Sequence, residues 1–385
     1  MTERVLTSDE RFRSLAATIV AMGVTAAIYS LTLPLFATRL DAMGHSELVI
    51  GINTAAQSVA LLAIAPLTPR LLRRFGAAQP MVVGFVATIV FMLLCPLFEN
   101  AWFWLIMRLL IGMSLGVLWI SGEAWVNQVS DDTSRGRNLA IYGMAGAVGT
   151  MAGFGLIFVI GHADWTPFLV MAGLSVICLM VISPAVNVSL PFQGETSHSL
   201  FRIFLVAPTP MVVNLLVAIT FGSLSTFVAI YVHDLGLTPD DAYLLLVLLS
   251  VGGILQYPVG WLADRVNHRA LAGIVLIFMV IMFAVMNPAI SDPLWRWPYA
   301  AILGTGMMSL YTLGLIMLGA RFRGADLGAA TTVFQITFNA GLVAGPFVVG
   351  FAMEKTGAGG LPWTLAVCYV VVILFALMRG RSRAT

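Results

Sequence analysis

Residues 102–130 read WFWLIMRLLIGMSLGVLWISGEAWVNQVS, and this stretch decides the fold. It is apolar, and it is longer than the roughly 20 residues with which a helix crosses a bilayer. It nevertheless contains two charged residues, Arg108 and Glu123. A charge at membrane depth is costly and usually faces a protein interior or a watery cavity. The stretch therefore predicts a functional transmembrane helix that other helices shield.

The two charges of this helix lie fifteen positions apart, with Arg108 first and Glu123 second. The rise of an α-helix separates them by roughly 22 Å along the axis. The helical repeat leaves them only about 60° apart around the axis. We therefore expect one face of the helix to carry both charges and neighbouring helices to cover that face.

The composition is that of a membrane protein. Of 385 residues, 59% are hydrophobic and 10% are charged, whereas soluble proteins carry about 25% charged residues. Apolar runs recur along the whole chain, and without an alternating barrel pattern they must be helices. A net charge of +2 gives no basic surface for nucleic acid, which excludes that class of partner.

The apolar runs define twelve predicted spans. Their approximate limits are 14–38, 47–69, 78–98, 102–130, 138–161, 165–187, 208–232, 241–263, 270–288, 297–320, 326–353 and 361–379. With both termini on the cytoplasmic side, sixteen of the twenty Lys and Arg residues fall on that side. Only Arg39, Arg296 and Lys355 fall on the outer side. This positive-inside bias predicts cytoplasmic termini.

The chain divides into two related halves. Residues 188–207 form the longest connection that contains polar residues, and they separate an N-terminal half, 1–187, from a C-terminal half, 208–385. PRLLRRFGAA at 69–78 and GWLADRVNHR at 260–269 follow the second span of each half. Duplicated halves place a substrate site near the membrane midplane between them. The prediction is therefore an all-α protein with two six-helix, pseudo-symmetric halves around a central cavity.

Polar side chains are concentrated in some spans and nearly absent from every third span. Spans three, six, nine and twelve are therefore suited to face lipid, while the others line a protein interior. The residues that we predict to line a substrate cavity are Tyr29, Asn53, Gln57, Trp119, Asn214, Gln256, Tyr311, Gln335 and Asn339. Amides can also join neighbouring helices, and aromatic residues can serve packing alone. The glycines of spans five and eleven are interpreted as sites of close helix contact.

The sequence resembles the major facilitator superfamily over nearly its whole length, and several motifs carry this resemblance. GWLADRVNHR resembles the loop motif of that family, although Arg73 stands where the first copy would carry an aspartate. Arg108 with Gly112 and Gly116 resembles the fourth-helix motif of drug:proton antiporters, and GEAWVNQ at 122–128 resembles a YcaD-like bacterial branch. The resemblance implies a multi-pass protein of the bacterial inner membrane, and we expect it to be a monomer.

The resemblance also implies a conformational latch at Gly260, Asp264, Arg265 and Arg269. In the resembling family, charge pairs and a helix-end dipole at this motif hold the outward-facing state. The alternative is an ordinary charged helix end that obeys the positive-inside rule.

For Arg108 and Glu123 the sequence leaves two interpretations open. Arg108 either organises a polar network that relays proton occupancy or is a structural cation satisfied by carbonyls and amides. Glu123 suits proton coupling because an apolar site tolerates its neutral form and disfavours its charged form. It could instead lie in a hydrated position or pair permanently with Arg135 or Arg137.

These features predict a secondary active transporter for a small, amphiphilic organic compound, and the resemblance to drug:proton antiporters implies proton-coupled efflux. Its partners would be the substrate, protons and the lipid bilayer. Proton-coupled or facilitated uptake of a metabolite is the alternative, and a membrane sensor is a third reading. Nothing indicates an enzyme, a cofactor or a metal site, because the sequence has no nucleotide-binding loop and no metal-ligand spacing. Cys95, Cys178 and Cys368 lie far apart inside apolar runs.

Overall fold

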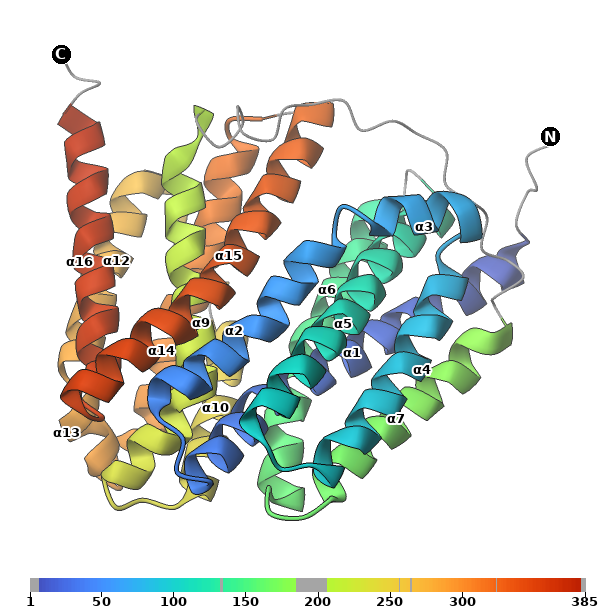
Figure 1. The fold of residues 1–385 in the computed structure, drawn as a ribbon. Helices are drawn as coiled ribbons and strands as arrows, with labels where there is room; N and C mark the ends of the chain where they lie inside the picture. The colour runs from blue at the N-terminus through green and yellow to red at the C-terminus, as the bar shows by residue number, and fades with distance from the viewer. Residues whose placement is uncertain are drawn as a thin grey trace. The chain divides into compact units, whose positions relative to one another are not determined.

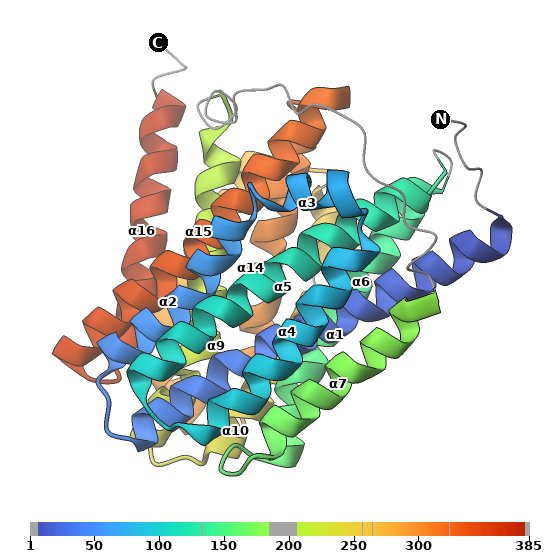
Figure 2. The ribbon, with the colours of Figure 1, turned by 45° about the vertical axis from the view of Figure 1, so that its right-hand side comes forward.

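The computed structural model describes residues 7–131, 134–184, 206–255, 257–263, 265–322 and 324–381. Within these ranges the chain is helical and contains no β-strand (Figures 1 and 2). The helices of the first half are α1 (Ser8–Ala42), α2 (Glu47–Ile64), α3 (Thr68–Phe75), α4 (Ala78–Leu94), the 3₁₀ helix η1 (Cys95–Leu97), α5 (Ala101–Val129), α6 (Arg135–Ile160) and α7 (Thr166–Ile182). Those of the second half are α9 (Pro208–Asp234), α10 (Pro239–Ile254), α11 (Tyr257–Ala263), α12 (His268–Ala284), α13 (Met286–Ser291), α14 (Arg296–Gly319), α15 (Gly324–Thr356) and α16 (Gly360–Arg381).

The helices match the predicted membrane spans. In the described part of the chain, nine helices are long and apolar enough to cross a bilayer, and α7 and α12 are shorter apolar helices. The remaining predicted span, 241–263, corresponds to α10 and α11 together. The all-α membrane fold is therefore confirmed.

Prolines explain two differences from the predicted limits. The second span was expected to run to residue 69, but α2 ends at Ile64, two residues before Pro66, and Pro69 lies in the first turn of α3. The eighth span was expected to be one helix, but α10 ends at Ile254, four residues before Pro258. A proline has no N–H to donate to the carbonyl four residues earlier, and its ring clashes there, so the helix breaks.

The chain forms two compact units, one of Met1–Leu35 with Ala56–Glu195 and the other of Phe36–Ala55 with Thr196–Thr385. We call them the first and the second unit. Both α1 and α2 are thus divided between units, and α1 carries Pro34 just before its change at Leu35. The predicted linker at 188–207 lies almost wholly outside the described residues, so the predicted domain boundary stays a prediction.

Glycines allow close helix packing inside each unit. In the first unit, a Cβ at Gly149 of α6 would lie 2.0 Å from the carbonyl oxygen of Gly23 in α1. In the second, a Cβ at Gly345 of α15 would lie 2.5 Å from the carbonyl oxygen of Ile219 in α9. Any side chain there would force the helices apart, so these glycines serve helix contact, as predicted.

The helices expected to face lipid expose apolar side chains. In the first unit, α4 packs on α5 and α7, and in the second, α12 packs on α16. Exposed apolar residues include Val83 on α4, Met180 on α7, Ile274 on α12 and Leu377 on α16. Such surfaces suit contact with acyl chains.

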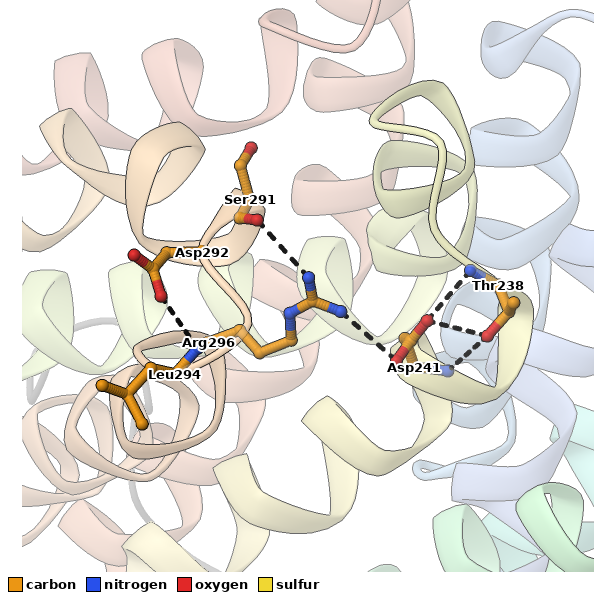
Figure 3. Close-up of polar contacts among 6 residues, drawn as sticks. All are labelled: Thr238, Asp241, Ser291, Asp292, Leu294 and Arg296. Carbon is orange, nitrogen blue, oxygen red and sulfur yellow. Dashed lines mark hydrogen bonds and ion pairs between the residues drawn. The ribbon is translucent and has the colours of Figure 1, made fainter.

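An ion pair joins the starts of α10 and α14 in the second unit (Figure 3). Arg296 Nη1 lies 3.5 Å from Asp241 Oδ1, and the Arg296 side chain is only 10% exposed. Asp241 Oδ2 also accepts from the backbone N–H and the hydroxyl of Thr238, which completes a capping box on α10 (Figure 3). Arg296 Nη2 donates to the Ser291 carbonyl, so this arginine ties three segments together.

Asp241→Asn is expected to lower the stability of the protein in detergent by about 1–3 kcal/mol, because it leaves a largely buried guanidinium without its counter-charge. Asp240→Asn is the matched control, since Asp240 is exposed and occupies the same first turn of α10. It removes a similar favourable charge from the helix N-terminus. Thermal unfolding of both variants measures the difference, and equal midpoints would mean that the ion pair contributes nothing.

Candidate functional site

Arg108 is fully buried in the first unit, at 0% exposure. Its Nη1 donates a hydrogen bond of 2.9 Å to the backbone carbonyl of Thr32 in α1. The approach of α5 to α2 is close, because a Cβ at Gly112 would lie 2.2 Å from the Gln57 carbonyl oxygen. Arg108 is therefore enclosed by α1, α2 and its own helix.

Thr32 is the centre of a buried polar network around this arginine. Its hydroxyl donates to the Tyr29 carbonyl at 2.7 Å, and Gln57 Nε2 donates to the same hydroxyl oxygen at 3.2 Å. The Tyr29 hydroxyl lies 3.3 Å from the hydroxyl of Ser58. Thus three residues predicted from the sequence, Tyr29, Gln57 and Arg108, belong to one network. The contact with the Thr32 carbonyl is of the kind expected for a structural cation, and a relay role stays a prediction.

Thr32 and Ser58 were not among the residues predicted from the sequence. Small hydroxyl residues occur throughout membrane helices, where their hydroxyl groups donate hydrogen bonds to nearby backbone carbonyls. The available signal was the position of Thr32, two residues before Pro34 in the same helix. A proline disturbs the regular helical bonds of the preceding turn, so polar groups near it are candidates for contacts with other helices.

Glu123 differs from the prediction. We expected both charges of α5 to be shielded by neighbouring helices, but Glu123 is exposed while Arg108 is buried. The spacing predicted a shared direction around the axis, and it held no information about which parts of that face other segments cover. None of the described residues forms an ion pair or a hydrogen bond with the Glu123 carboxylate, and permanent pairing with Arg135 or Arg137 is therefore not observed.

The neighbours of Glu123 on α5 are fixed by local bonds. Trp119, one turn earlier, is partly buried, and its carbonyl accepts from the Tyr142 hydroxyl of α6 at 3.2 Å. Asn127, one turn later, donates from Nδ2 to the Glu123 carbonyl at 2.9 Å. Tyr142 also packs with Met22 and Val126. The helix around Glu123 is thus well packed, whereas its carboxylate makes no ion pair or hydrogen bond with a described residue.

In the second unit, aromatic and amide groups gather on α14 and α15. The Tyr311 ring lies 5.4 Å from that of Phe334 and 5.8 Å from that of Phe338, both edge-on. Asn339 Nδ2 donates to the Gln335 carbonyl at 2.9 Å, and both amide residues are partly buried. These groups form a polar, aromatic surface without charge.

Other predicted cavity residues have different environments. Asn214 is fully buried and donates from Nδ2 to the Phe334 carbonyl at 2.6 Å, so it joins α9 to α15. Asn53 is also buried, at 2% exposure. Gln256 lies outside the described residues.

The predicted latch is only partly described. Gly260 lies in α11, and Asp264 lies outside the described residues. The Arg265 guanidinium stacks over the Trp261 ring at 3.4 Å. The Arg269 backbone N–H donates to Asn267 Oδ1 at 2.9 Å, which caps the start of α12. These contacts fit a charged helix end, and the latch stays a prediction.

No group of metal-ligating side chains occurs among the residues that the structure describes. Cys95 and Cys178 are buried as free thiols, and Cys368 is partly buried.

The sequence is similar to one large family and to several of its proteins. The sequence profile described as Major Facilitator Superfamily matches residues 15–309 and 211–384. The uncharacterized MFS-type transporter YfkF of Bacillus subtilis is 24% identical over 374 residues, which are 95% of this chain and 95% of that protein. The uncharacterized MFS-type transporter YcaD of Escherichia fergusonii is 24% identical over 326 residues, 82% of each chain.

Solved structures share the fold at lower identity. The nucleoside transporter NupG has a TM-score of 0.78 at 11% identity and covers 96% of this chain and 98% of its own. A bacterial homolog of the human lysosomal transporter Spinster, in an inward-facing and unoccupied conformation, has a TM-score of 0.74 at 12% identity and covers 97% and 96%. At these identities the likeness concerns the fold alone.

Proposed function

The chain belongs to the major facilitator superfamily, and from this membership we propose that it exports a small amphiphilic compound across the bacterial inner membrane in exchange for protons. The family makes it a multi-pass membrane transporter, and the relatives that carry the MFS-type name extend over most of its length. Our proposal adds the direction, the coupling ion and the substrate class.

The observation that supports proton exchange is that the Glu123 carboxylate makes no ion pair or hydrogen bond with any described residue. It lies within an apolar helix, without an ion pair to any described residue, and Trp119 stands one turn earlier on the same helix. A carboxylate beside an aromatic ring can bind either a proton or an organic cation. If the two compete for this one group, the inward proton gradient drives the cation outward.

Arg108 has a different part in the proposal. Its buried contact with Thr32 couples α5 to α1, and through Gln57 to α2. A change in the position of α5 when Glu123 loses its proton would therefore reach both other helices. We propose that Arg108 organises this network and touches neither the substrate nor the proton.

The orientation, the latch and the oligomeric state also belong to the proposal. The Arg and Lys distribution supports cytoplasmic termini. The resemblance of residues 260–269 to the family's loop motif supports a latch there. We propose a monomer as the transporting unit.

Uptake of an uncharged metabolite is a second candidate, and one observation favours it. Tyr311 and Phe338 offer aromatic faces beside the amides of Gln335 and Asn339, with no charge in this set. Such a surface suits a heteroaromatic ring with hydrogen-bonding edges. The structural neighbour NupG is a nucleoside transporter by name.

A ligand screen followed by flux measurement tests the proposal. Thermal shift of the purified protein with hydrophobic cations and with nucleosides would find a ligand. Liposomes with an imposed pH gradient would then report flux, and liposomes without a gradient are the control. We expect a hydrophobic cation to move against its own gradient, toward the side with the higher proton concentration.

Flux that does not depend on the pH gradient, or a thermal shift with nucleosides alone, would contradict proton-coupled export and support uptake. A protein that binds ligands yet carries no flux in either liposome would support the sensor reading.

A further inference from the structure

The second unit contains a cavity of about 340 Å³ that is separate from every residue discussed so far. It lies where α9 ends, α12 passes into α13, and α16 begins, at one end of this unit (Figure 1). Its size reaches the lower end of the range typical of small-molecule sites, roughly 300–1,000 Å³. From its lining we propose that it binds an organic ammonium ion, either a solute or the amine headgroup of a lipid.

The charge of the lining selects a cation. Asp234, the last residue of α9, is the one ionisable acid or base in the lining besides the weakly acidic Tyr231, and its side chain is exposed. It forms no ion pair with any residue that the structure describes, so its charge is available. His233 acts electrostatically on the nearby Asp41, and Glu47 and Asp234 act on it with the opposite sign, so Asp234 lies in a group of interacting charges.

The aromatic residues of the lining favour an organic cation over a metal ion. Three aromatic residues, Tyr231, Phe283 and Trp363, are among those that line the cavity. Aromatic faces attract ammonium groups through their quadrupoles, and a carboxylate beside them completes the usual pattern for such ligands. A metal ion would require several oxygen ligands, and no group of three metal-ligating residues occurs in the described ranges.

Hydrogen-bonding groups of the lining suit a polar head. Asn287 of α13 is exposed in the lining and offers an amide. Tyr231 also lines the cavity, but it is 1% exposed and its hydroxyl is buried, so the Asn287 amide is the neutral hydrogen-bonding group within reach of a ligand.

The position of Trp363 suits a ligand with an apolar part. This residue stands in the first turn of α16 and is 66% exposed. Tryptophan is enriched at the membrane–water interface, where one side of the ring meets lipid. Leu235, Pro288 and Pro362 add apolar surface. An ammonium group at Asp234 with an apolar group toward Trp363 fits this arrangement.

Two substitutions and one control test the site in the full-length protein. Asp234→Asn removes the charge and keeps the shape. Gly359→Leu fills the cavity, and it should fold because a Cβ at Gly359 would contact only Trp363 Cδ1, at 3.9 Å. Asp240→Asn is the control, because Asp240 is an exposed acid of the same unit outside the cavity lining.

Two binding measurements form the test, one with a soluble cation and one with lipids. In the first, benzyltrimethylammonium is titrated into the purified protein and binding is measured by calorimetry. The lipid arm uses native mass spectrometry to count retained phosphatidylethanolamine against phosphatidylglycerol after both are supplied in equal amounts. We expect Asp234→Asn and Gly359→Leu each to weaken binding about tenfold or more, with Asp240→Asn within about twofold of wild type.

The arms identify the source of the ligand. Binding of benzyltrimethylammonium that depends on Asp234, with no lipid preference, indicates a site for a solute. A preference for phosphatidylethanolamine that depends on Asp234, without binding of benzyltrimethylammonium, indicates a site for a lipid. Equal binding by the wild type and both cavity variants in both arms would overturn the proposal. The readout is binding at this cavity, so failure of the proton-coupled export proposal would leave the result standing.

Discussion

Glu123→Gln is expected to abolish transport driven by a pH gradient. Glutamine reproduces the neutral form of the carboxyl group and cannot lose a proton, so the exchange of proton for substrate has no site. Binding of an uncharged ligand, and its downhill movement, should remain measurable. The variant should fold, because no described residue depends on the Glu123 carboxylate for an ion pair or a hydrogen bond.

The matched control for this change is Glu354→Gln, which neutralises an exposed acid at the far end of α15. Flux in liposomes with and without a gradient would be compared for both variants. In the wild type, cation binding should weaken as the pH falls, because protons compete for Glu123, and the Gln variant should lose this dependence. Gradient-driven accumulation at the wild-type level in Glu123→Gln would show that coupling occurs elsewhere.

Arg108→Lys is expected to insert and fold and yet to lose most of its flux, about tenfold or more. The guanidinium reaches the Thr32 carbonyl with one arm of a planar, multi-donor group. An ammonium is a compact charge on a flexible stem and does not reproduce that geometry. A buried cation that loses its acceptor costs roughly 1–3 kcal/mol, which corresponds to this loss.

Arg296→Lys provides the comparison, because Arg296 is a second largely buried arginine whose partner is the Asp241 carboxylate. A lysine can keep that attraction, so flux should stay near the wild-type level. Size-exclusion profiles and thermal midpoints would show that both proteins are folded. Full flux in Arg108→Lys would mean that positive charge alone is required, and the network would have no special role.

Much of the fold follows from residue chemistry alone. Each of the twelve apolar runs corresponds to a helix or a helix pair, because a lipid-exposed backbone has no other way to satisfy its polar groups. The breaks at Pro66 and Pro258 were also readable, since each proline removes a helical hydrogen bond. The predicted spans nevertheless extend past both prolines, because their limits followed the apolar runs and not the effect of proline on the helix backbone.

The site was less predictable, and the reason is geometric. Helical spacing places Arg108 and Glu123 near one face, but burial depends on where neighbouring segments start and stop. Gln57 and Tyr29 could be selected as polar residues in apolar spans. Their meeting with Arg108 at Thr32 depends on how α1, α2 and α5 pack together, including the close approach of α2 to α5 at Gly112, which no single-sequence pattern gives. The cavity at Asp234 joins segments more than a hundred residues apart and left no local signal.

The division of α1 between the two units has a mechanical consequence. One part of the helix packs with the first unit and the remainder with the second, and the change falls after Leu35, the residue that follows Pro34. Pro34 cannot donate to the carbonyl of Ser30, so the bending stiffness of α1 is lowest in that turn. Any bending of α1 would therefore be concentrated in this one turn, and the helical segments before and after it would stay straight. The same turn holds Thr32, whose carbonyl accepts from Arg108, so strain in the helix would be felt first at the buried arginine.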